Sequence, residues 1–192
     1  MSAATSARIG ARPARVGLGQ PALLGVALFI ASESIFFLAI VVAYVALRAG
    51  GLATAKTELD IVRTFIFSLF LFSSSATMSL AERRGSRLWL AATGVLGAVF
   101  LTGQGLEYAR LLGGGIAPSS GLFGTTFFTL TGLHALHVLG GLAAIAALYA
   151  ASSLRPARVR GTAWQAVAWY WHFVDGVWVV VFSVVYLGTA LS

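Results

Sequence analysis

Residues 127–141 read Phe127-Phe128-Thr129-Leu130-Thr131-Gly132-Leu133-His134-Ala135-Leu136-His137-Val138-Leu139-Gly140-Gly141. They lie inside a longer apolar segment, yet they hold two of the chain's three histidines, His134 and His137. Residues three apart project from the same face of a helix, so both imidazoles are expected on one side of it. Because a polar ring within a membrane-spanning helix is costly, these histidines are candidates for a functional or helix-joining role.

The composition of the 192-residue chain is typical of a membrane protein. Hydrophobic residues make up 58% of it, charged residues make up 10%, and the mean hydropathy is +0.89. The apolar runs are about 20 residues long, which is the length of a helix that crosses roughly 30 Å of hydrocarbon. A transmembrane barrel would instead show alternating segments of about ten residues. We therefore predict an all-α integral membrane bundle.

Several function classes are excluded by residue type. The sequence has no cysteine, which removes disulfides, thiolate metal sites and iron–sulfur clusters. The net charge of +7 comes from basic residues at the flanks of apolar segments, so we attribute it to topology and anionic lipid headgroups. We expect no nucleic-acid partner. Nothing resembles a nucleophile–base pair or a phosphate loop, and we expect no catalytic residue in this chain.

Five apolar segments are long enough to cross a membrane. Residues 1–20 precede them and are small, polar and basic, which predicts a mobile cytoplasmic tail before a transmembrane domain over residues 21–192. In the third segment Gly94, Gly97 and Gly103 predict a close approach between helices. The five predicted spans are about 22–47, 61–81, 88–108, 122–151 and 162–191.

The distribution of lysine and arginine predicts the orientation of the bundle. One side carries nine of these residues: Arg8, Arg12, Arg15, Arg83, Arg84, Arg87, Arg155, Arg158 and Arg160. The other side carries four: Arg48, Lys56, Arg63 and Arg110. Because cytoplasmic loops are enriched in positive charge, we predict a cytoplasmic N-terminus and a C-terminus outside.

Seven polar side chains inside the predicted spans are candidate site residues. They come from four of the five spans and are Glu33, Gln104, Glu107, His134, His137, His172 and Asp175. The three histidines could in principle hold zinc or copper, with Asp175 orienting one imidazole, or two of them could ligate a haem. Hydrogen bonding between helices explains the same residues as readily. We expect no metal and no cofactor in this chain, and we interpret the seven as structural, lipid-binding or proton-uptake residues.

Specific partners are expected for these side chains. The three histidines and Asp175 are predicted to bond the fourth span to the fifth or to lipid headgroups, and His172 could pair with Asp175 along its own helix. Glu33, near the middle of the first span, is expected to bond to Ser32, to Ser34 or to a hydroxyl of a neighbouring helix. Serines and a threonine of the second span offer hydroxyls to their own helix or to a neighbour; they are Ser73, Ser74, Ser75 and Thr77. Tryptophans at seven-residue spacing predict a packing stripe on the fifth span; they are Trp164, Trp171 and Trp178.

Four motifs resemble, in the same order, those of subunit III of the haem-copper oxidases. The segment Thr131-Gly132-Leu133-His134-Ala135-Leu136-His137-Val138 closely resembles the family's Thr-Gly-Phe-His-Gly-Leu-His-Val, with Leu133 and Ala135 as the departures. The segment Tyr170-Trp171-His172-Phe173-Val174-Asp175, followed by Val177-Trp178, matches its final-helix motif. Ser32-Glu33-Ser34-Ile35-Phe36-Phe37 is similar to its Ser-Glu-x-x-Phe-Phe, and Gln104-Gly105-Leu106-Glu107-Tyr108 to its Gln-x-x-Glu-Tyr.

The resemblance implies a non-redox accessory subunit of an aerobic terminal oxidase in the bacterial cytoplasmic membrane. Such a subunit packs directly against the catalytic subunit I, supports proton uptake, and binds structural phospholipid in a cleft between its helices. Haem and copper are then expected in the partner subunits, and subunit II and a small subunit IV are expected in the same complex. The chain resembles the short, five-span form of the family, which starts at the equivalent of the third span of the long form. It therefore lacks one arm of the lipid cleft.

Alternatives remain open at this stage. The Tyr170-Trp171-His172 motif favours cytochrome c as electron donor, whereas Phe127-Phe128-Thr129-Leu130 is also seen among cytochrome bo type quinol oxidases. The small subunit of some nitric oxide reductases shares the histidine motif. A different class is a small proton-conducting transporter that uses Glu33, Glu107 and the histidines as a relay. The lack of an internal repeat in the sequence counts against a transporter.

Overall fold

The computed structural model describes residues 21–47, 50, 52–154 and 161–191. Within these ranges the regular structure is helical throughout, and five helices are long and apolar enough to cross a membrane. They are α1 (Pro21–Leu47), α3 (Ile61–Arg84), α4 (Arg87–Gly113), α5 (Gly121–Leu154) and a last helix over Gly161–Ala190. The predicted all-α bundle of five spans is therefore confirmed. The tail over residues 1–20 and the arginines at 155, 158 and 160 lie outside the described residues, and the orientation stays a prediction.

The helices extend beyond the apolar runs that predicted them. α3 continues through Arg84 rather than ending at residue 81, and α4 continues to Gly113 rather than 108. Charged residues in these last turns do not interrupt a helix, because outside the hydrocarbon they are solvated or paired. The last helix consists of α6 (Gly161–Phe182), a π-helical turn η3 (Ser183–Leu187) and α7 (Gly188–Ala190). A seven-residue helix, α2 (Leu52–Glu58), was not predicted because it is too short and polar to show an apolar run.

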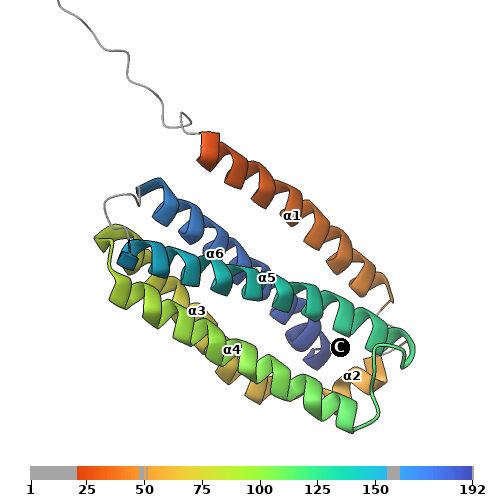
Figure 1. Ribbon diagram of the computed structural model, residues 1–192. Coiled ribbons are helices and arrows are strands. Elements are labelled where there is room, and N and C mark those ends of the chain that lie inside the picture. The colour runs from red at the N-terminus through yellow and green to blue at the C-terminus, as the bar shows by residue number, and fades with distance from the viewer. Residues whose placement is uncertain (1–20, 48–49, 51, 155–160, 192) are drawn as a thin grey trace, which may run out of the picture.

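Four of the long helices form a ring. α3 packs on α4, α4 on α5, α5 on α6, and α6 closes the circle by packing on α3. We call this arrangement the four-helix ring. α1 lies along one side of it and makes its main contacts with α5 and α6 (Figure 1). The short helix α2 lies at the end of the ring where α3 begins and the chain ends (Figure 1).

Tight turns and caps set the direction of α3 and α4. Asp60 caps the N-terminus of α3, and its carboxylate accepts the backbone N–H of Arg63 at 2.9 Å. Gly85 ends α3 with φ +58°, a left-handed conformation that glycine adopts without steric cost. Only Gly85 and Ser86 separate α3 from α4, which begins at Arg87, and the two helices pack against each other as antiparallel neighbours.

Large aromatic side chains fill the interior of the four-helix ring, and glycines on the neighbouring helices leave room for them. Trp171 is fully buried, and a Cβ atom at Gly97 would lie 2.6 Å from its indole, while one at Gly141 would lie 2.8 Å from it. A Cβ atom at Gly103 would overlap the ring of Phe67. The predicted close approach is confirmed at Gly97 and Gly103, whereas Gly94 makes only an ordinary 3.5 Å contact with Ile145. The predicted packing role is also confirmed for the tryptophans, since Trp164, Trp171 and Trp178 are all buried.

Candidate functional site

The seven predicted polar residues fall into four separate groups. Two groups join helices through hydrogen bonds, one fixes the end of the bundle that carries α2, and one is enclosed in the ring's interior. The groups are Glu33 with His137, His172 with Asp175, Glu107 with its ionic partners, and Gln104 with His134.

Glu33 and His137 join α1 to α5. The Glu33 Oε2 and His137 Nε2 atoms are 3.2 Å apart, and His137 Nδ1 is 2.8 Å from the carbonyl oxygen of Leu133. Because Nδ1 must donate to that carbonyl, the pair holds one further proton, on either the carboxyl group or Nε2. The hydroxyl of Ser34 donates to the carbonyl oxygen of Ile30 at 2.7 Å and not to Glu33. The predicted bond from Ser34 to Glu33 is therefore wrong.

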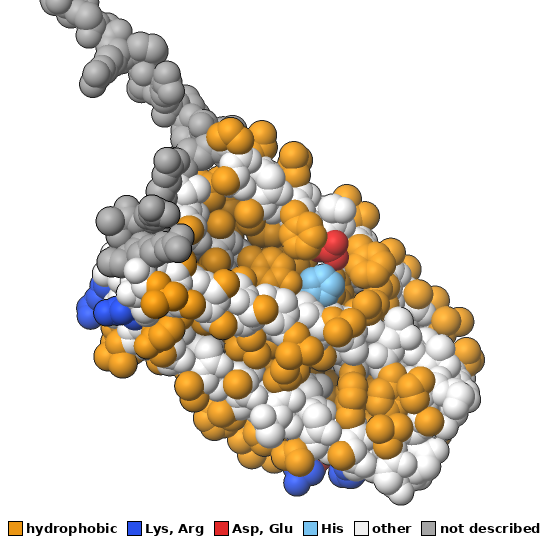
Figure 2. All heavy atoms as spheres, viewed as in Figure 1, with side chains coloured by type: hydrophobic (Ala, Val, Ile, Leu, Met, Phe, Trp, Pro, Cys, Tyr) orange, Lys and Arg blue, Asp and Glu red, His pale blue; other side chains and the backbone are white. Residues whose placement is uncertain are grey.

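This pair is only partly covered. The side chains of His137 and Glu33 are 17% and 22% exposed. Figure 2 shows an acidic side chain beside a histidine in a hollow of an otherwise apolar face. Phe37 of α1 packs its ring edge against His137, with centroids 4.8 Å apart, and so shields one side of the pair. The pair is therefore a partly exposed polar contact within an apolar seam.

Two hollows follow the seam between α1 and α6. The first, of about 390 Å³, lies between residues 34–41 of α1 and residues 173–180 of α6. The second, of about 410 Å³, lies between residues 22–29 of α1, residues 166–170 of α6 and Ala144 of α5. Their lining is almost entirely apolar. Glu33 falls between the two along α1, so a polar pair separates two apolar hollows.

His172 and Asp175 join α6 to α3. Both contact Ser75: its hydroxyl donates to Asp175 Oδ2, and it lies 3.1 Å from His172 Nδ1. Since the serine has one proton and gives it to Asp175, the tautomer of His172 that carries a hydrogen on Nδ1 donates to Ser75. The hydroxyl of Ser79 lies 3.3 Å from His172 Nε2 and donates to the carbonyl oxygen of Ser75 at 3.1 Å. The predicted bond from these two residues to the fourth span is wrong, because their hydrogen-bond partners in the structure lie on the second span; the predicted alternative of lipid headgroups stays a prediction.

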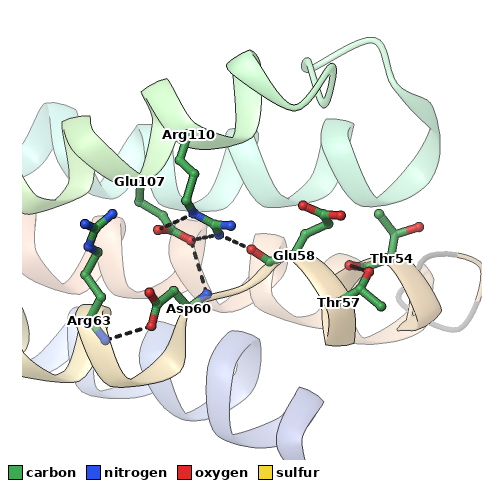
Figure 3. A network of polar contacts seen from close by, with 7 residues as sticks. All are labelled: Thr54, Thr57, Glu58, Asp60, Arg63, Glu107 and Arg110. Carbon is green, nitrogen blue, oxygen red and sulfur yellow. Dashed lines mark hydrogen bonds and ion pairs between the residues drawn. The ribbon is translucent and has the colours of Figure 1, made fainter.

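Glu107 is the centre of an ionic group at the end of the ring near α2. Its side chain is 1% exposed, and Arg110 approaches it with Nη2 at 2.7 Å from Oε1 and Nε at 3.3 Å from Oε2. Arg110 also donates to the backbone carbonyl of Glu58, and the N–H of Asp60 donates to Glu107 at 3.4 Å. Figure 3 shows Arg110 between Glu107 and the backbone of Glu58, with the guanidinium of Arg63 pointing away from Asp60. This group fastens the link between α2 and α3 to α4.

Arg110 was missed as a site residue. From the sequence we interpreted it only as a charge that sets the topology, although its spacing of three from Glu107 is the spacing of helical ion pairs. Its bond to Glu58 had no signal in the sequence, because the two residues are 52 positions apart.

Gln104 and His134 lie in the interior of the ring. The two residues are 4% and 0% exposed. The His134 imidazole stacks on Trp178 with ring centroids 4.9 Å apart and an interplanar angle of 26°, and the edge of Phe100 lies against it. This contact with α6 agrees with the predicted link between the fourth and fifth spans, but it is made by ring stacking rather than by a hydrogen bond.

The three histidines point to different neighbours. His134 faces Trp178 of α6, His137 faces Glu33 of α1, and His172 faces the serines of α3. Over the described ranges, no three histidine, aspartate or glutamate side chains come close enough together to hold a metal ion. Glu33 and Glu107 likewise belong to different groups, which does not favour a relay through both.

These features define a multi-pass membrane protein whose polar side chains mainly fasten its helices together. Comparison with known proteins gives the family. The model of the family described as cytochrome c oxidase subunit III matches residues 9–190. The chain therefore belongs to the cytochrome c oxidase subunit III family and is a subunit III of the haem-copper oxidase complexes.

Individual relatives support the same assignment. The chain is 35% identical to cytochrome c oxidase subunit 3 of Corynebacterium diphtheriae, over 97% of this chain and 98% of the relative. It is 36% identical to a probable cytochrome c oxidase subunit 3 of Mycobacterium leprae, over 85% and 86% of the two chains. It is 35% identical to cytochrome c oxidase subunit 3 of Synechocystis sp., over 88% and 77%. The first of these relatives is of similar length, as expected for a short form of the family.

Proposed function

We propose that this chain is a non-redox accessory subunit of an aerobic cytochrome c oxidase in the bacterial cytoplasmic membrane. In this role it stabilises the catalytic subunit I, supports proton uptake and holds phospholipid. The observation that carries the proposal is that the ionisable groups inside its spans are engaged in joining helices. Glu33 bonds to His137, both His172 and Asp175 bond to Ser75, and Glu107 accepts the backbone N–H of Asp60 at the start of α3.

Redox centres belong, in this proposal, to the partner subunits. A haem with two axial histidines would need two imidazoles facing one cavity, but His134, His137 and His172 face three different helices. The proposed donor is cytochrome c, because the named relatives are cytochrome c oxidase subunits. Oxygen uptake by the purified complex with reduced cytochrome c, compared with a reduced quinol, tests this choice. A complex that oxidises only quinol would contradict it.

Lipid binding is supported by the seam between α1 and α6. The two hollows of about 390 and 410 Å³ are apolar and elongated along the helices, as an acyl chain requires. Within the apolar part of α1 only 11% of the residues are buried, against 33% in the corresponding parts of α3 and α4. Since α1 leaves most of its surface uncovered, we propose that lipid and another oxidase subunit cover it. Subunit I is the proposed direct partner, with subunit II and a small subunit IV in the same complex.

Purification in a mild detergent tests the accessory assignment. The tagged chain is expected to bring down a haem-containing subunit I, and after separation from it to show no haem or copper absorption. A stable, haem-free oligomer of this chain that moves a solute would overturn the proposal. A stoichiometric metal on the isolated chain would also overturn it and would point back to the histidines.

Lipid analysis is a second, independent test. Phospholipid is expected to remain with the washed complex and to be lost when a hollow is filled, for example in Gly176→Phe. Gly176 lines the first hollow, and nothing lies within 4 Å of a Cβ atom built there. Gly105→Phe is the matched control, because Gly105 is equally open but lies on α4, away from the seam. Equal lipid retention in both variants would contradict lipid binding in the seam.

A further inference from the structure

The interior of the four-helix ring contains polar atoms that no described residue satisfies. Neither ring nitrogen of the fully buried His134 has a hydrogen-bond partner, and the Oε1 atom of Gln104 has none either. Buried polar groups in folded proteins are nearly always hydrogen-bonded to protein or to ordered water. At membrane depth the requirement is stronger, because the surrounding hydrocarbon offers no hydrogen bonds.

The neighbours of His134 cannot satisfy it. Trp178 lies parallel to the imidazole at 4.9 Å, so it covers the face of the ring, whereas the nitrogens bond in the ring plane. The indole N–H of Trp178 is itself engaged, since it donates to the hydroxyl of Ser68 at 2.8 Å. Phe100 offers only a ring edge. A neutral imidazole has one donor and one acceptor, and both remain to be matched.

Gln104 lies at the same level of the ring as His134. The register of α4 against α5 is given by Tyr108, whose hydroxyl is 2.7 Å from that of Thr131, and by Gly97, where a Cβ atom would lie 3.2 Å from Leu142. Because the two helices run antiparallel, stepping along α4 from Tyr108 places Gln104 opposite residues 134–135 of α5. Both side chains are buried, and they belong to adjacent helices at one level of the bundle.

We propose that the ring holds a buried site for ordered water, in which one water molecule bridges His134 and Gln104. Water suits this position because it donates and accepts at once, and can therefore give a hydrogen to Gln104 Oε1 while it bonds to an imidazole nitrogen. Bound water of this kind joins polar groups that cannot reach each other directly. The site would tie α4 to α5 next to the stacked pair of His134 and Trp178. It does not depend on the function proposed above.

A density map of the intact oxidase complex, at a resolution that shows ordered water, tests the site directly. The expected result is a peak about 2.7 to 3.2 Å from one nitrogen of His134 and from Gln104 Oε1. Two results would overturn the proposal. One is a direct hydrogen bond between the two side chains. The other is the absence of any density peak between His134 and Gln104.

A double-mutant cycle in the same complex provides a second readout. His134→Phe and Gln104→Leu are each expected to lower the temperature at which this chain is lost from the complex, by about 5 °C, because each leaves the water and the other side chain unsatisfied. The double variant removes all the polar partners together and is expected to lose clearly less than the sum. His134→Phe combined with Thr102→Val is the control. Thr102 lies exposed on α4 and bonds to its own helix at 2.9 Å, so that pair should be additive. Additive losses in the Gln104 pair would contradict a shared water.

Discussion

The four-helix ring and the outer helix α1 are built on different principles. The ring encloses Trp171 and Trp178 without exposing them, and its helices are joined by hydrogen bonds from several buried side chains. α1 is the more apolar segment, with a mean hydropathy of 2.5, yet it is the least buried of the five spans. A polar contact between Glu33 and His137 joins it to α5. High hydropathy therefore marks the helix that this chain leaves largely uncovered, whereas moderate hydropathy with interior polar groups marks the self-contained core.

This contrast predicts that substitutions in the ring damage the fold of the chain, whereas substitutions on α1 leave the fold intact and affect what binds beside it. The largest effect is expected for Trp171→Ala. The indole fills the space left by Gly97 and Gly141, and its N–H donates to Ser74 at 2.8 Å. Its removal should cost about 3 to 5 kcal/mol in unfolding free energy. The amount of this chain in the purified complex measures it. Trp169→Ala, on the same helix but 36% exposed, is the control and should assemble.

A smaller loss is expected when Glu107 loses its partner. Arg110→Met leaves a carboxylate that is 1% exposed without its counter-charge. Breaking a buried ion pair costs about 3 to 5 kcal/mol, and we expect the lower end because the Arg110 side chain is 36% exposed. Thermal stability of the complex measures the loss, and the double variant Glu107→Leu with Arg110→Met should recover most of it. If the double variant is as unstable as Arg110→Met, the ion pair is not the cause.

Ser75→Ala is expected to have an intermediate effect. One hydroxyl serves both His172 and Asp175, so its removal leaves two groups short of a partner at a cost of about 1 to 3 kcal/mol. Retention of the chain during a detergent wash is the measurement. Ser73→Ala is the matched control, since that exposed hydroxyl bonds to the Leu69 carbonyl of its own helix. Equal retention of both variants would show that the bond between α3 and α6 adds no stability.

The smallest effect on stability is expected at α1. Glu33→Gln keeps the shape of the side chain and a hydrogen bond to His137, and a partly exposed ion pair contributes about 1 kcal/mol or less. The variant oxidase should assemble and start at a near-normal rate of oxygen uptake, because the proposed role routes no electrons through this subunit. It should lose activity sooner during sustained turnover, as the contact beside the proposed lipid hollows is weakened. An unchanged lifetime would leave Glu33 with a packing role alone.

The sequence predicts the spans well and the partners of the polar residues poorly, for a physical reason. A bilayer demands about 20 apolar residues per helix, so each span is visible as a local run. The choice of partner depends on which helices become neighbours, and this is a property of the whole bundle. His172 and Asp175 share a helix face in the sequence, but their hydrogen bonds go to Ser75, about 100 residues away. The link from Arg110 to Glu58 was hidden in the same way.

The family motifs single out residues that meet in the folded bundle, which the periodicity of the sequence does not. The motif containing Glu33 and the motif containing His137 are distant in the sequence, yet the structure brings these two side chains to 3.2 Å. The motifs of α4 and α5 likewise place Gln104 and His134 at one level of the ring. Periodicity shows that such residues are inward-facing candidates, whereas only the packed helices show which of them meet.

The most direct test of the accessory role is the initial rate of cytochrome c-dependent oxygen uptake, per haem, in an oxidase carrying His137→Ala. We predict that less of the chain is retained in the complex, because Glu33 loses its partner, while the rate per assembled complex equals that of the unsubstituted oxidase. Full assembly together with abolished electron transfer would contradict the account, since His137 would then act in the redox reaction rather than in holding α1 to α5.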